Sequence, residues 1–195
     1  MTGNTVQQAG EYTVDEMTIL TSSGVVYDLR QMVQYIEIFE DVNRPVITGN
    51  IVIMDIDNMI ENAPIIGQEF MSLKIRTPSF GDEDGIIDFS DNVFSIFKIM
   101  SKDDASMNAQ IYTLSFCSPE LLRSNRTKVS KSYTGSIDEI VEKVLRDERF
   151  INTRKKLIFE KTSGIRKIIS PNLRPFAFID QLKEEALSEK YGSPH

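Results

Sequence analysis

The segment Glu69-Phe-Met-Ser-Leu-Lys-Ile-Arg-Thr77 alternates between apolar and polar side chains. Met71, Leu73 and Ile75 fall on one side of an extended chain, whereas Ser72, Lys74 and Arg76 fall on the other. Successive side chains of a strand point to opposite faces, so a period of two is typical of a half-buried β-strand. This segment predicts a sheet with one apolar face and one polar face.

Six further runs on either side of this segment have a similar composition. Each is rich in Ile, Val, Phe and Tyr, and turn-forming residues such as Ser23-Gly24 and Asn43-Arg-Pro45 separate them. The predicted strands are 14–20, 25–29, 32–39, 47–55, 93–101 and 109–118. About seven short strands joined by short loops indicate an antiparallel barrel or sandwich.

Two of these predicted strands are apolar on both sides, at residues 51–54 and 93–100. An isolated barrel exposes one face to water, so something has to cover the second face of these strands. A helix of the same chain or another subunit would do so. The pattern favours assembly only weakly.

The pattern changes after Ser118. Ser136-Ile-Asp-Glu139 predicts a capping box, in which the Ser136 hydroxyl accepts a hydrogen bond from the amide three residues on. Apolar residues at helical spacing extend this helix over 136–147. A second helix is expected from Pro175 to a closing Gly192. Short strands at 156–161 and 165–170 and a short helix at 119–124 complete the second part. The sequence thus predicts an α+β fold, with an antiparallel β-barrel domain over 1–118 and a small α+β domain over 119–195.

Charge divides the chain at the same place. The 195 residues have a net charge of −7. Residues 1–118 contain 18 acidic and 6 basic residues, a net charge of −12, whereas residues 119–195 contain 11 acidic and 16 basic residues, a net charge of +5. Two modules that attract one another or face different neighbours would produce this division, and so would two ordinary solvated surfaces.

Composition excludes several classes of function. Cys117 is the only cysteine, and His195, the last residue, is the only histidine. An internal disulfide and a cysteine-based metal site are excluded, and the commonest general base is missing. No apolar run approaches the roughly 20 residues of a membrane-spanning helix, and residues 1–10 lack the features of a secretory signal. No phosphate-binding glycine motif or nucleophile elbow is present. We expect a protein made in the cytoplasm that is not an enzyme, with no catalytic, cofactor-binding or metal-binding residues and no membrane partner.

Three clusters of charged residues are candidates for chemistry. The first is an acidic loop within residues 81–92. Its oxygen ligands suit Ca²⁺, but it lacks the spacing of an EF-hand, and a solvated loop is the favoured interpretation. Asp55 and Asp57 could serve as the acid and base of a hydrolase, but a turn after a strand is favoured. The third is a basic cluster between residues 123 and 156. It could bind phosphates or contact an acidic neighbouring subunit. The acidic loop contains Asp82, Glu83, Asp84, Asp88 and Asp91; the basic cluster contains Arg123, Arg126, Lys128, Lys131, Arg154, Lys155 and Lys156.

A series of short motifs runs along the chain. It begins with Gly49-Asn-Ile51, the turn from Asp55 to Asn58, and Ile66-Gly-Gln-Glu69. It continues with Ser118-Pro-Glu-Leu-Leu122, Gly135-Ser136 and the helix after Pro175. In order and spacing the series resembles the N-terminal portion of the central baseplate hub protein of contractile-tailed, T4-like phages.

This resemblance implies a structural role without catalysis. The first domain would be a tube-type barrel, and a second such barrel would follow in a longer natural chain. The full-length hub would be a homotrimer that meets the tail tube protein on one side, the trimeric spike protein on the other, and baseplate wedge proteins around it. Its expected location is the tail baseplate of the virion. DNA would pass through the lumen without specific binding, because a barrel at −12 repels phosphates. The alternative is a small-ligand or Ca²⁺-binding β-barrel module that uses the 81–92 loop.

Overall fold

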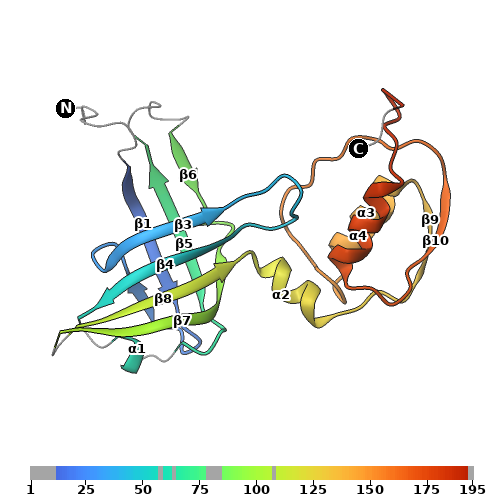
Figure 1. Ribbon diagram of the computed structural model, residues 1–195. Coiled ribbons are helices and arrows are strands. Elements are labelled where there is room, and N and C mark those ends of the chain that lie inside the picture. The colour runs from blue at the N-terminus through green and yellow to red at the C-terminus, as the bar shows by residue number, and fades with distance from the viewer. Residues whose placement is uncertain (1–11, 57–58, 63–64, 78–84, 107–108, 193–195) are drawn as a thin grey trace. The chain divides into compact units, whose positions relative to one another are not determined.

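The computed structural model describes residues 12–56, 59–62, 65–77, 85–106 and 109–192. Contacts within the chain divide it into two compact units, Met1–Pro119 and Glu120–His195. In Figure 1 the first unit runs from blue to yellow-green and the second from yellow to red. Each unit has its own hydrophobic core.

Unit 1 is built on one antiparallel sheet. Its strands are β1 (Thr13–Leu20), β2 (Val26–Asp28), β3 (Val33–Phe39), β4 (Thr48–Asp55), β5 (Phe70–Arg76), β6 (Ile86–Asp88), β7 (Phe94–Ser106) and β8 (Ala109–Cys117). The strand order is β2-β1-β5-β7-β8-β4-β3, and β6 pairs with β5. All seven predicted strands are confirmed, and so is the α+β class. The three-residue strand β6 was not predicted.

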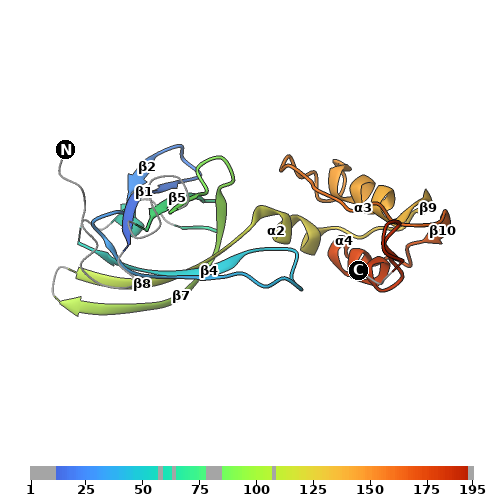
Figure 2. The same cartoon turned by 90° about the horizontal axis from the view of Figure 1, so that it is seen from above.

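The sheet folds back on itself but does not close into a complete ring of strands. In Figure 2, β1, β2 and β5 lie across the unit from β4, β7 and β8. Within the described residues the path of paired strands ends at β2 and β3. A tight turn joins these two strands, because the Leu29 carbonyl accepts hydrogen bonds from the amides of Met32 and Val33. The barrel is therefore open between β2 and β3.

Buried apolar side chains fill the space inside the folded sheet. Met71, Leu73 and Ile75 of β5 point inward as predicted, together with Met17 and Ile19 of β1. Across the unit the core contains Ile51, Ile53, Phe94, Ile96, Tyr112, Leu114 and Phe116, and the short helix α1 (Met59–Asn62) adds Met59 and Ile60. The alternation in the sequence thus correctly predicts which side chains of β5 lie on the inner face of the sheet.

Gly49 makes room for an aromatic ring in this core. It is the register partner of Phe116 in the β4–β8 ladder. A Cβ atom at Gly49 would lie 2.3 Å from Phe116 Cζ and 2.2 Å from the Glu37 carbonyl oxygen. The Phe116 ring also packs against Phe94, with the ring centroids 4.9 Å apart. The first motif of the series therefore contains a glycine that the packing requires.

Glu69 ends the loop before β5 with a buried carboxylate. Its side chain is fully buried, and Oε1 accepts a hydrogen bond from the Ile66 amide at 2.8 Å. Oε2 accepts from the amides of Gly67 and Gln68 at 2.9 and 3.1 Å. Gly67 has a φ of +85°, which favours glycine. The motif Ile66-Gly-Gln-Glu69 is thus a loop closed by its own carboxylate.

The outer face of the sheet is mixed. Val52 and Met54 of β4 are half-buried, and neighbouring Asn50 accepts a hydrogen bond from Ser115 Oγ at 2.8 Å. On β7, Phe97 and Met100 are 42% and 53% exposed. The register of β7 with β8 shifts beside both of these residues, so the strand bulges there. That a helix of the same chain or another subunit covers this apolar part of the outer face stays a prediction.

Unit 2 packs helices on a two-stranded antiparallel sheet. Its elements are α2 (Pro119–Arg126), which starts at the unit boundary, β9 (Ser132–Gly135), α3 (Ile137–Arg146), β10 (Arg166–Ile169) and α4 (Pro175–Glu184). The core joins Tyr133 of β9, Ile140 and Val144 of α3, and Phe178 and Leu182 of α4. The helices predicted at 119–124 and 136–147 are confirmed. No helix of the described residues is both long enough and apolar enough to cross a membrane.

Several details of unit 2 differ from the prediction. The final helix ends at Glu184 rather than Gly192, because the Glu185 and Ala186 amides bond back to Leu182 and Lys183 in a tighter turn. Residues 156–161 are not a strand. Residues 165–170 contain β10, and its partner β9 was not predicted. The pairing of β9 with β10 is long-range, so local sequence does not encode it.

The predicted capping box does not form at the start of α3. Ser136 is the N-cap residue but makes no side-chain capping hydrogen bond. Thr162, from a distant segment, accepts a hydrogen bond from the Asp138 amide at 3.1 Å, and its hydroxyl donates to Asp138 Oδ1 at 2.6 Å. The cap is therefore tertiary rather than local.

Candidate functional site: a basic groove beside β9

Asp55 is one of the two carboxylates predicted at the end of β4, and its oxygens are not available for chemistry. This residue is 1% exposed. Its Oδ1 accepts a hydrogen bond from the Met59 amide at 2.9 Å, and its Oδ2 accepts from the Ile60 amide at 3.0 Å. Both oxygens thus hold the start of α1, which gives Asp55 a structural role. Asp57 lies outside the described residues.

The acidic loop is described only in part. Asp82, Glu83 and Asp84 lie outside the described residues. Asp88 forms an ion pair with Lys74 at 2.8 Å and accepts hydrogen bonds from the Ser90 hydroxyl and amide, and these contacts, led by Lys74, hold its pKa well below the usual range. Asp91 is exposed. Among the described residues no group of three potential metal ligands comes together.

The basic cluster does not form one continuous strip of free cations. Arg123 donates to the carbonyl oxygens of Ile151 and Asn152 at 3.0 and 2.9 Å, and Lys155 pairs with Glu120 at 3.1 Å. Arg123 is nevertheless exposed, and the other exposed members are Arg126, Lys128, Lys131, Arg154 and Lys156. Lys131 lines a groove.

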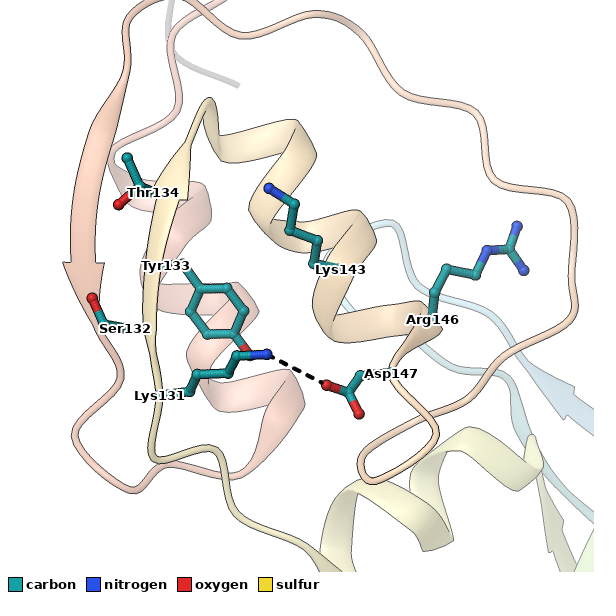
Figure 3. Close-up of a pocket in the computed structure, with 7 residues that line it drawn as sticks. All are labelled: Lys131, Ser132, Tyr133, Thr134, Lys143, Arg146 and Asp147. Carbon is teal, nitrogen blue, oxygen red and sulfur yellow. Dashed lines mark ion pairs between the residues drawn. The ribbon is translucent and has the colours of Figure 1, made fainter.

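That groove runs between β9 and α3 and has a volume of about 470 Å³. Figure 3 shows the seven residues that line it. They are Lys131, Ser132, Tyr133 and Thr134 from β9 and the residue before it, and Lys143, Arg146 and Asp147 from the end of α3. The spacing of the last three residues places them on one side of the helix. We call this feature the β9 groove.

The charges of the β9 groove are unbalanced. Asp147 is engaged by Arg149 at 2.7 Å and by Lys131 at 3.8 Å. The hydrogen bonds from Arg149 lower the pKa of Asp147 to about 2, against the opposing effect of burial. Arg146 Nη1 donates to the Thr153 carbonyl oxygen at 2.7 Å. The Lys143 ammonium group has no ion-pair partner among the described residues. Positive charge therefore exceeds negative charge along the groove.

Tyr133 contributes a polar group that lacks a partner. The residue is 5% exposed, and its hydroxyl is buried without a hydrogen-bond partner in the described part of the chain. Figure 3 shows the hydroxyl end of the ring directed toward Lys131 and Asp147. Burial raises the pKa of Tyr133, and the charge of Asp147 raises it further. The phenol is therefore protonated at neutral pH and has an unused donor.

Sequence reasoning identified one wall of this site and missed the other. Lys131 belongs to the predicted basic cluster, and Tyr133 is the aromatic residue nearest to it in the sequence. Lys143 and Arg146 were not singled out. Their spacing on α3 was a visible signal, but it identifies a site only once β9 is known to lie beside the helix.

Comparisons with known proteins give a fold rather than a family. No protein-family model matches the chain, and none of the curated proteins matches it. A chain of the lidded Francisella PdpA–VgrG complex is similar in structure, with a TM-score of 0.50 and 16% identity over 93% of this chain and 27% of that chain.

A second similar structure is the E. coli c3393 protein. It is a component of the type VI secretion system that exhibits structural similarity to T4 bacteriophage tail proteins gp27 and gp5. Its TM-score is 0.49 with 14% identity, over 92% of this chain and 41% of that chain. The chain thus spans less than half of either solved chain. The predicted resemblance is confirmed as a likeness of fold, to a chain of the PdpA–VgrG complex.

Proposed function

We propose that this chain is a structural part of a contractile-tail baseplate, as the portion of a central hub subunit that joins the tail tube to the spike. The observation that carries the proposal is the fold shared with a chain of the PdpA–VgrG complex over 93% of this chain. The motif series supports it, because Gly49 and Glu69 hold the packing and the loop closure of unit 1. The partners are the tail tube, the spike and wedge proteins.

The outer face of unit 1 supports assembly. Phe97 and Met100 expose apolar surface beside the bulges of β7, and a covered sheet face is the usual fate of such residues. In this proposal residues 1–118 form a tube-type barrel whose outer face contacts neighbouring subunits. Residues 119–195 form a second domain, and the full-length subunit is a homotrimer around a DNA conduit.

Co-expression tests this function. The full-length reading frame would be produced with the tube and spike proteins encoded in the same genome, and the product would be studied by light scattering and electron microscopy. We expect a threefold particle that binds both proteins. Phe97→Glu combined with Met100→Glu is expected to prevent assembly, whereas Val42→Glu, on a fully exposed side chain, leaves it intact.

A monomer that binds neither tube nor spike would contradict the proposal. A melting temperature raised by Ca²⁺ alone would favour the ligand-binding alternative. Because neither result involves the β9 groove, this test is independent of the inference that follows.

A further inference from the structure

The outer edge of β9 presents backbone groups to the β9 groove. In the β9–β10 ladder Tyr133 faces Ile168, and the Ser170 amide donates to the Lys131 carbonyl oxygen at 3.0 Å. Hydrogen-bonded pairs alternate along an antiparallel ladder, so Lys131, Tyr133 and Gly135 bond to the β10 side. The N–H and C=O groups of Ser132 and Thr134 therefore point away from β10.

This free edge lies on the side of α3. Figure 3 shows β9 between β10 and α3, with Ser132 and Thr134 on the strand that borders the groove. The groove volume of about 470 Å³ is within the range of roughly 300–1,000 Å³ that is typical of ligand sites. Two backbone donors and two backbone acceptors thus border an open, positively charged space.

We propose that the β9 groove binds an extended acidic segment of a partner protein, which adds to the free edge of β9 as a third strand. The backbone of such a segment offers donors and acceptors at strand spacing, which the groups of Ser132 and Thr134 require. Its carboxylates match Lys143, Arg146 and Lys131, because Asp147 is already neutralised by Arg149.

The unused hydroxyl of Tyr133 fits the same ligand. A carbonyl or carboxylate oxygen at the Lys131 end of the groove would accept its hydrogen bond, which removes the cost of a buried donor without a partner. A compact anion such as phosphate fits less well. Phosphate accepts hydrogen bonds, but the two carbonyl oxygens at the edge of β9 would repel it. A single-stranded nucleic acid would need an exposed aromatic ring for stacking, and Tyr133 is buried.

A binding experiment with a defined probe tests the proposal. The probe is a short, capped, fluorescent peptide of alternating Thr and Glu, and the matched peptides replace Glu with Gln or Lys. Each is titrated into the full chain and followed by anisotropy, and inorganic phosphate is titrated separately. We expect only the acidic peptide to bind, and we expect it to slow hydrogen exchange at the amides of Ser132 and Thr134.

One variant pair isolates the backbone contact. Thr134→Pro removes an N–H that points away from β10, and therefore leaves the β9–β10 hydrogen bonds in place. Ile169→Pro is the matched control, because Ile169 faces Ser132 in the ladder and its N–H points to the opposite, outer edge of β10. Thr134→Pro is expected to weaken peptide binding about tenfold. Ile169→Pro is expected to leave it unchanged.

A second variant pair isolates the charge and does not depend on a proline being tolerated. Lys143→Glu reverses a charge in the groove, whereas Lys167→Glu reverses an exposed charge on β10. The first is expected to weaken acidic-peptide binding at least tenfold and the second to have little effect. Acidic peptide methylated on alternate backbone nitrogens is expected not to bind, like the Gln peptide.

Three results would overturn the proposal. The first is no binding of the acidic peptide, in which case the lysines only protect an exposed strand edge from pairing. The second is an equal effect of Thr134→Pro and Ile169→Pro. The third is phosphate binding that Lys143→Glu abolishes and Thr134→Pro does not change, which would identify a site for a compact anion.

Discussion

The Glu69 carboxylate stabilises unit 1 by accepting three backbone hydrogen bonds in a loop without regular structure. A buried carboxylate is costly unless its oxygens are satisfied, and here the amides of Ile66, Gly67 and Gln68 satisfy them. The same arrangement gives these amides partners that a loop otherwise lacks. One side chain thus fixes the entry into β5.

Glu69→Gln is expected to destabilise unit 1 by about 2 kcal/mol, because the new amide nitrogen would face backbone donors instead of accepting from them. Urea unfolding followed by circular dichroism measures this change. Glu40→Gln, at an exposed position, is the control and should change stability by less than about 0.5 kcal/mol. Equal stability of the two variants would show that the carboxylate does not hold the loop.

Asp147 makes the stability of unit 2 depend on pH in the acid range. Its pKa in the folded chain is about 2, below its ordinary value of 3.8. Its charge therefore stabilises the fold above about pH 4, and this contribution is lost as the pH falls through about 4 to 2. Asp147→Asn is expected to cost about 1 kcal/mol at neutral pH, since the ion pair with Arg149 is partly exposed.

Asp147→Asn should also reduce the loss of stability that unit 2 shows as the pH falls from about 4 to 2, the acid limb of its stability curve. Hydrogen exchange of the α3 amides across pH reports the stability of unit 2 separately from unit 1. Glu148→Gln, at the exposed neighbouring residue, should keep the wild-type profile. An acid limb unchanged by Asp147→Asn would refute the assignment.

At the scale of elements, α3 depends on a residue that is far away in the sequence. Thr162→Val removes the hydroxyl that bonds Asp138, and we expect the first turn of α3 to lose about 1 kcal/mol. Ser136→Ala removes the residue that the sequence suggested as the cap and should cost less, because Ser136 makes no capping hydrogen bond. Hydrogen exchange in the first turn measures both, and the reverse order of effects would support the local capping box.

The long elements were predictable because each carries its own periodicity. β1, β4, β5, β7 and β8 alternate or are continuously apolar, and α3 repeats apolar residues at helical spacing, so burial on one side determines each of them. The short elements β6, α1 and β9 contain three or four residues, too few for a period to be visible. They form because a neighbouring strand or a buried carboxylate satisfies their backbone.

The β9 groove could be predicted only in part for the same reason. Composition identifies Lys131 as part of a basic cluster. The free edge of β9 depends on its register with β10, which lies about thirty residues further along the chain. The unpaired state of the Tyr133 hydroxyl depends on the packing of α3 and α4 around its ring.

At the scale of the whole molecule, the two units have separate cores. We propose that they are two domains, and this predicts independent unfolding. Leu73→Ala in unit 1 and Val144→Ala in unit 2 each truncate a fully buried side chain, at an expected cost of about 2–4 kcal/mol for Leu73→Ala and less for Val144→Ala. Hydrogen exchange by mass spectrometry should show faster exchange only in the unit that carries the substitution. Acceleration in both units by either variant would show a single cooperative unit.

Cys117 offers a direct measure of how unit 1 opens. It is the only thiol of the chain, it is fully buried, and β8 holds it between Thr48 of β4 and Ser95 of β7. Because Phe116 points into the core, the neighbouring Cys117 side chain points to the other face of the sheet, at the end of β8. A thiol-specific reagent can reach its sulfur only when the buried end of β8 opens. The labelling rate therefore counts these local opening events, with no engineered probe.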